Sequence, residues 1–222
     1  MSHNAIAEKR FQDAAQYYWV LATESLSLVT KMGSKASKDD KKYLKSFEEY
    51  SKLAEIYQAY NLINKYIEES YRQVINSPLY YESVFNASRF LVNNLGHRAP
   101  QGINKVYIYQ TLATLGYKFE AYKTARLGYE VLSSMKVPDH MMEEIEVEAL
   151  KIRSKPFQDK DGFAFNYNRC MNIQPLVNQK GDFCVNCGAP VVRNFGSFDT
   201  LPLVEFVPEG NIPIAKAIEL LK

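Results

Sequence analysis

The stretch YQTLATLGYKFEAYKTARLGY, residues 109–129, decides the fold of this chain. Its apolar residues recur at helical spacing, which predicts two helices over residues 103–115 and 118–134, separated near Gly116. Two large and one small side chain in the first helix are followed by a small and a large one in the second: Tyr109, Leu112, Ala113, Ala125 and Tyr129. This order is typical of a tetratricopeptide repeat, in which small side chains leave room where two helices cross.

Helical patterns also flank this pair of helices. We predict further helices over residues 4–30, 43–74, 77–95 and 139–155. Residues 31–42 (KMGSKASKDDKK) are polar and contain a glycine, which predicts a linker. Several of the predicted helices are apolar on two faces and must pack on two sides, as in a solenoid of stacked helical hairpins. An irregular helical bundle is the alternative for the same pattern.

The composition changes near Lys155-Pro156, where glycine, proline and alternating aromatic residues replace the helical pattern. We therefore predict a mainly α protein of two domains. Residues 1–155 form a tetratricopeptide-like helical solenoid segment, and residues 156–222 form a small, zinc-ribbon-like α+β module that carries the cysteines. Within this module the pattern predicts strands over residues 163–167 and 203–206 and a helix over residues 213–221.

The strongest local motif is CVNCG, residues 184–188. Two cysteines separated by two residues can hold one metal ion from a tight turn. The glycine that follows lets the backbone turn so that its N–H groups face the sulfurs. Cys170 precedes Cys184 by fourteen residues, close to the separation of the two turns in a zinc ribbon.

The predicted metal ligands are Cys170, Cys184 and Cys187, and the predicted cofactor is zinc. A closed structural zinc site has four ligands, and the position that would complete a second C-x-x-C pair holds Tyr167. The three histidines of the chain lie far away in sequence, and Asp182 would be an unusual fourth ligand. A metal-free turn with reduced, partly buried cysteines is therefore the alternative to a zinc site.

Other classes of function find little support in the sequence. The net charge of +2 gives no electrostatic footprint for a polyanion, so we predict no nucleic-acid partner. No phosphate-binding glycine loop, nucleophile elbow or H-E-x-x-H motif occurs, which predicts that the chain is not an enzyme. No stretch approaches the run of about 18 apolar residues expected of a membrane span. Three clustered cysteines favour a reducing intracellular compartment.

Several separated blocks of the chain resemble one known family. The blocks include FNASRFLVNNL at residues 85–95, GINKV at 102–106, IRSKPF at 152–157 and the cysteine segment. Together with LVEF at residues 203–206 they resemble the intraflagellar transport protein 122 family, over about residues 45–222. The family typically has two C-x-x-C pairs, of which this chain keeps the second, while Tyr167 stands in the first.

The resemblance implies a non-catalytic scaffold. Members of the family resemble coat subunits, with WD-repeat propellers, then a tetratricopeptide-like solenoid, then a cysteine-rich end that this chain would match. The implied role is retrograde ciliary transport and ciliary entry of membrane cargo. The implied partners are other subunits of the intraflagellar transport A complex and ciliary membrane-protein cargo adaptors. The implied locations are the cilium, the ciliary base and the cytoplasm. A zinc-ribbon nucleic-acid-binding module with a helical support domain is the alternative function.

Overall fold

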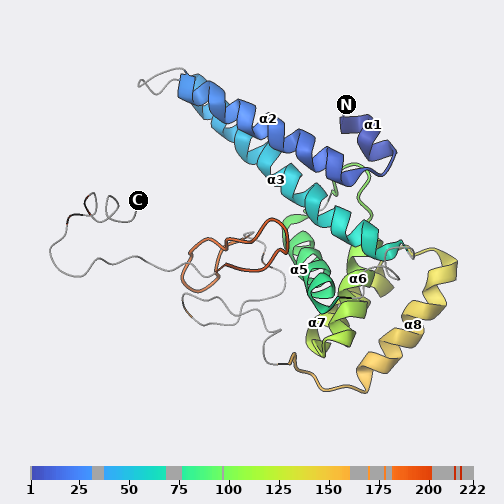
Figure 1. The fold of residues 1–222 in the computed structure, drawn as a ribbon. Helices are drawn as coiled ribbons and strands as arrows, with labels where there is room; N and C mark the ends of the chain where they lie inside the picture. Colours follow the sequence, from blue (N-terminus) through green and yellow to red (C-terminus); the bar gives the residue numbers. More distant parts are fainter. Residues whose placement is uncertain are drawn as a thin grey trace.

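The computed structural model describes residues 2–31, 38–68, 77–96, 98–160, 170, 178, 182–201, 213 and 216. This part of the chain is mainly α, as predicted, and its only β pairing consists of isolated bridges. The helices are α1 (Ser2–Ala7), α2 (Phe11–Lys31), α3 (Lys38–Ile67), α5 (Pro78–Asn94), α6 (Lys105–Lys118), α7 (Tyr122–Ser134) and α8 (Asp139–Arg153). In Figure 1, α2 and α3 form a long antiparallel pair; α5 and α6 pack against α3, α7 packs on α6, and α8 packs on α7.

Two boundaries in the first half of the chain differ from the prediction. The block predicted as one helix over residues 4–30 is two helices, because Lys9 adopts a left-handed φ of 57° between α1 and α2. The linker predicted over residues 31–42 is wrong in its second half, where α3 already begins at Lys38. The predicted linker has its glycine at Gly33, and the charged run after it contains no helix breaker.

The break predicted near Gly116 is also displaced. Helix α6 continues through this glycine to Lys118, and the turn that follows is centred on Glu120, whose φ is 60°. Gly116 lies instead where α6 crosses α7: a Cβ on it would be 3.2 Å from Cβ of Ala125. The close crossing expected from the alanines is therefore present, and glycine contributes to it as well. The stacking of the whole segment as a tetratricopeptide-like solenoid stays a prediction.

Gly128 is the tighter of the two glycine contacts, and we expect Gly128→Ala to lower the stability of the chain. The added Cβ would lie 2.9 Å from Cβ of Ala113, so α6 and α7 would have to separate. Overpacking of this kind costs about 1–3 kcal/mol, more than the gain of about 1 kcal/mol in helix propensity. Urea denaturation measures the difference. Gly96→Ala is the matched control, because no atom lies within 4 Å of its Cβ; equal stability of the two variants would contradict the expectation.

The segment after α8 folds back and holds the ends of α7 and α8 in place. Asp159 accepts hydrogen bonds from the backbone N–H and the hydroxyl of Thr124, each at 3.0 Å, in the first turn of α7. Arg126 donates to the backbone oxygens of Ile152 and Lys155 at the end of α8. A carboxylate at a helix N-terminus and a cation at a helix C-terminus both match the helix dipole.

The core of the described residues forms two main clusters of apolar side chains. One joins α1, α2, α3, α5 and α6, and the other joins α6, α7 and α8. Phe198, from the segment 182–201, belongs to the first cluster and is only 2% exposed. This segment therefore packs on the helices through its own core residue. None of the described helices has both the length and the apolar character that a bilayer span requires.

Candidate functional site

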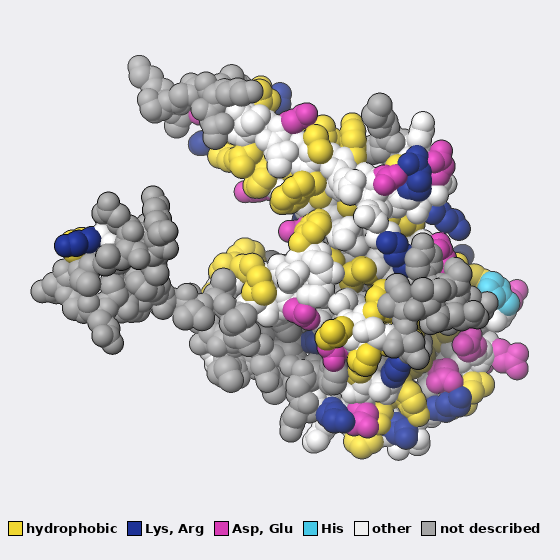
Figure 2. All heavy atoms as spheres, viewed as in Figure 1, with side chains coloured by type: hydrophobic (Ala, Val, Ile, Leu, Met, Phe, Trp, Pro, Cys, Tyr) yellow, Lys and Arg dark blue, Asp and Glu magenta, His cyan; other side chains and the backbone are white. Residues whose placement is uncertain are grey.

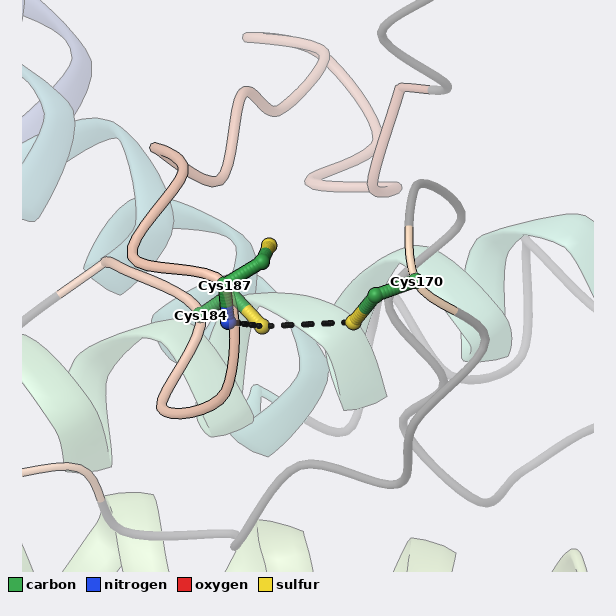
Figure 3. A group of neighbouring side chains, drawn as sticks. All are labelled: Cys170, Cys184 and Cys187. Carbon is green, nitrogen blue, oxygen red and sulfur yellow. Dashed lines mark hydrogen bonds between the residues drawn. The ribbon is translucent and has the colours of Figure 1, made fainter.

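The structure brings the three predicted metal ligands together. Their sulfurs all lie within 4.8 Å of one another, and Sγ of Cys170 is 3.5 Å from Sγ of Cys184. Figure 3 shows that Cys184 and Cys187 come from one loop and that Cys170 faces them from another. Zinc bound tetrahedrally at Zn–S distances of about 2.3 Å separates its sulfurs by about 3.8 Å. The cluster therefore fits three corners of a zinc tetrahedron after small side-chain rotations.

The environments of the three thiols differ. Cys184 is buried, Cys170 is partly buried and Cys187 is exposed. A backbone hydrogen bond at Ala189 favours the thiolate of Cys187, but desolvation and the neighbouring thiols outweigh it and raise the pKa of Cys187. Without a metal ion, this thiol stays protonated at neutral pH. A bound zinc ion would reverse that preference, since zinc binds thiolates and releases their protons.

Neither of the two other residues considered as a fourth ligand is placed among the sulfurs by the described part of the structure. Tyr167 lies outside the described residues. The carboxylate of Asp182 is bound elsewhere: it accepts hydrogen bonds from the amide of Asn94 at 2.8 Å and from Arg193 at 3.1 Å. Asp182 therefore helps to attach the segment to α5 and does not join the sulfurs.

The backbone around CVNCG adopts the turn that the motif predicts. The N–H of Cys184 donates to the carbonyl of Ala189 at 2.8 Å, and the N–H of Gly188 donates to the carbonyl of Cys184 at 3.0 Å. The N–H of Cys187 points at Sγ of Cys184, 3.4 Å away. Gly188 has a φ of 69°, the left-handed conformation that glycine adopts without strain. Backbone N–H groups that face the sulfurs stabilise thiolates, as a metal site requires.

The same turn recurs ten residues later, without cysteine. The N–H of Asn194 donates to the carbonyl of Asp199, and the N–H of Phe198 donates to the carbonyl of Asn194, both at 2.8 Å. The bridge between Phe183 and Pro190 has its counterpart between Arg193 and Thr200. Each pairing of the first turn thus has an equivalent in the second, although the sequences DFCVNCGAPV and VRNFGSFDTL do not show the repeat.

In the second turn, Asn194 takes the place of the cysteine sulfur. Its Oδ1 accepts hydrogen bonds from the N–H of Gly196 at 2.8 Å and of Ser197 at 3.4 Å. Phe198 occupies the glycine position with a left-handed φ of 56°. This conformation costs a bulky residue about 1–2 kcal/mol, and burial of its ring against the helices offsets that cost. The second turn is therefore held by a side-chain amide and by packing.

We expect Asn194→Ala to destabilise residues 192–201 by about 1 kcal/mol, because each hydrogen bond that Oδ1 accepts contributes roughly 0.5–1.5 kcal/mol. The metal content should not change, since Asn194 is not part of the cysteine cluster. Hydrogen exchange of the backbone amides measures the effect, and Asn194→Asp, which keeps an acceptor oxygen, is the matched control. Faster exchange confined to residues 184–190 would contradict this role.

One face of α5 holds the segment against the helices. Asn86 donates to Asp199, the ring of Phe90 lies 5.1 Å from that of Phe198, and Asn94 donates to Asp182. These three residues of α5 follow each other at intervals of four, so they form a single stripe along the helix. The stripe lies within FNASRFLVNNL, the block that contributed to the family resemblance. In the structure, this block attaches the segment 182–201 to the helices, which its residue spacing alone does not indicate.

A cleft of about 890 Å³ lies between the α2–α3 pair and the second turn. Trp19 of α2 reaches Phe195 across it, with ring centroids 5.8 Å apart, and Phe90 also lines it. In the sequence, Trp19 has the same helical spacing as the buried residues of α2. In the structure, however, its side chain is 46% exposed. No sequence signal therefore pointed to this cleft, because the exposure of Trp19 is seen only in the folded chain.

Comparison with known proteins agrees with this geometry. Residues 166–204 match the family model described as "IFT122, zinc ribbon domain". The whole chain aligns with Intraflagellar transport protein 122 homolog of Danio rerio at 35% identity and with those of Mus musculus and Homo sapiens at 37%. The alignments cover 100% of this chain but only 17–18% of each relative, so the chain spans less than a fifth of their length. The resemblance inferred from the sequence blocks is thereby confirmed: the chain is related over its whole length to a segment of the intraflagellar transport protein 122 family, the segment that contains the zinc ribbon domain.

Proposed function

We propose that this chain is a non-catalytic scaffold segment of the intraflagellar transport A complex. The whole-length similarity to the family carries this proposal. The proposed partners are other subunits of that complex and ciliary membrane-protein cargo adaptors. The proposed role is retrograde ciliary transport and ciliary entry of membrane cargo, at the cilium, the ciliary base and in the cytoplasm. Exposed apolar side chains such as Trp19, Leu79 and Phe195 suit a chain that works through protein contacts.

The zinc ribbon contributes a structural role to this proposal. Cys170, Cys184 and Cys187 are the proposed zinc ligands, and zinc would tie the loop of Cys170 to the turn of Cys184 and Cys187. We also propose the two-domain division at residues 1–155 and 156–222. Zinc held by thiolates in this arrangement fastens chain segments together, and no catalytic role is assigned to it.

The nucleic-acid alternative has no support from the described turn segment. Arg193 is the only basic residue within residues 182–201, and it forms an ion pair with Asp182 at 3.1 Å. Both side chains of the pair are largely shielded from solvent. Binding to a phosphate backbone requires several accessible lysines or arginines, which this segment does not offer.

Affinity purification from ciliated cells tests the scaffold proposal. The full chain with an affinity tag is expected to recover other subunits of the intraflagellar transport A complex, and the tag alone is expected to recover none. A tagged chain that stays outside the complex and away from cilia would contradict the proposal. Salt-sensitive binding of the purified chain to DNA or RNA would favour the alternative function.

A further inference from the structure

The cleft beside the second turn is apolar and open on one side. Its volume of about 890 Å³ accommodates several side chains. Trp19 and Val20 of α2 are 46% and 52% exposed, and Phe195 on the opposite wall is 44% exposed. Figure 2 shows apolar side chains gathered along the α2–α3 pair on this face. Apolar side chains that remain accessible along a concave surface are typical of an interaction site.

The cleft also contains the carboxylate of Glu55, which forms no ion pair with the part of the chain that the structure describes. Glu55 lies on α3 and lines the cleft. Its carboxylate accepts no hydrogen bond from the described residues. Desolvation by burial and, next, the charge of Asp182 raise the pKa of Glu55. Lys52 and Arg193 lower it only through space, and Arg193 is already bound to Asp182 at 3.1 Å. The group that best complements this position is a cation.

The polar and apolar features lie close enough together for one ligand. On α2, Gln12, Gln16 and Val20 recur every four residues along the same wall, which makes the cleft about two helical turns long. Glu55 and Gln58 face it from α3, while Phe90 and Phe198 line its apolar part. A ligand that fills the cleft must combine a large apolar group with a positive charge about one helical turn away.

We propose that this cleft binds a peptide segment of a partner protein, which buries a large apolar side chain beside Phe90 and places a lysine or arginine next to Glu55. The inference rests on the proposed scaffold function and assigns one of its contact surfaces. Cation–π contact with the exposed ring of Trp19 would add to the ion pair. A peptide is favoured over a compact small molecule, because the cleft is open and follows a helix for two turns.

Selection from a random dodecapeptide library displayed on phage, with the purified full chain as target, tests this proposal. The enriched peptides are expected to share a leucine, methionine or aromatic residue with a lysine or arginine three or four positions away. Glu55→Gln should weaken their binding at least tenfold, and Trp19→Ala should do the same. Glu24→Gln, an exposed glutamate on α2 outside the cleft, is the matched control and should leave the affinity unchanged.

A charge exchange makes the test specific. A selected peptide whose basic residue is changed to glutamate should lose binding to the original chain and regain it with Glu55→Lys. Three results would each overturn the proposal. The selected peptides could lack a basic residue, or their affinity could be unchanged by Glu55→Gln. The chain could also self-associate in a way that Trp19→Ala abolishes. The result is separate from the purification experiment: recovery of transport subunits without any selected peptide would refute the cleft assignment and leave the scaffold function standing.

Discussion

Replacing Cys184 with serine is expected to lower the zinc content of the purified chain from about one atom per molecule to near zero. Cys184 is the buried member of the cluster, and its sulfur lies 3.5 Å from that of Cys170 and accepts the N–H of Cys187. Serine offers no thiolate, and only two cysteines would remain in the chain. Two thiolates do not complete a structural zinc site, whose norm is four protein ligands.

The measurement is metal analysis by mass spectrometry, combined with thermal unfolding with and without a chelator. Zinc bound only by the folded chain stabilises it, so the chelator should lower the melting temperature of the original chain and leave that of Cys184→Ser unchanged. Ser197→Ala is the matched control, because Ser197 occupies the position of Cys187 in the turn that has no cysteines. A zinc content near zero in the original chain would favour the metal-free alternative for these three cysteines.

Phe198→Ala is expected to weaken the attachment of residues 182–201 to α5 by about 3–5 kcal/mol. The ring is 2% exposed and packs 5.1 Å from Phe90. Alanine removes this contact but keeps the strain of the left-handed φ of 56°, so nothing compensates for the loss. The hydrogen bonds from Asn86 and Asn94 of α5 are partly accessible to water and contribute less.

Trp19 reports on this attachment, because it is the only tryptophan of the chain and contacts Phe195 of the second turn. Its fluorescence should therefore change at a lower urea concentration in Phe198→Ala than in the original chain. Phe195→Ala is the matched control, since its ring is 44% exposed and its removal should cost far less. Unfolding of the two variants at the same urea concentration would contradict the anchoring role of Phe198.

Local patterns in the sequence were sufficient for the helices and for the first turn. The spacing around Tyr109, Leu112 and Ala113 predicted the α6–α7 pair, because helical periodicity repeats within a few residues. The motif CVNCG predicted a turn whose backbone N–H groups face the sulfurs, and the N–H of Cys187 does point at Sγ of Cys184. The helix boundaries at Lys9 and Glu120 were not predicted, because both residues adopt left-handed conformations that their residue types do not favour.

The second turn and its packing on α5 depended on contacts between residues far apart in the sequence, which no local pattern contains. Asn194 and Phe198 form a turn like that of CVNCG, yet they share none of its residue types. Phe198 can take the glycine position only because α5, far away in sequence, supplies Phe90 to bury its ring.

The sequence by itself therefore determined the mainly helical class, the cysteine turn and the family. The tertiary structure decided that Cys170 meets Cys184, that one stripe of α5 holds the segment 182–201, and that Glu55 shares a cleft with Trp19 and Phe195. The physical reason is the range of the interactions involved. Hydrogen bonds within helices and turns join residues a few positions apart, whereas burial joins any residues that the folded chain brings into contact.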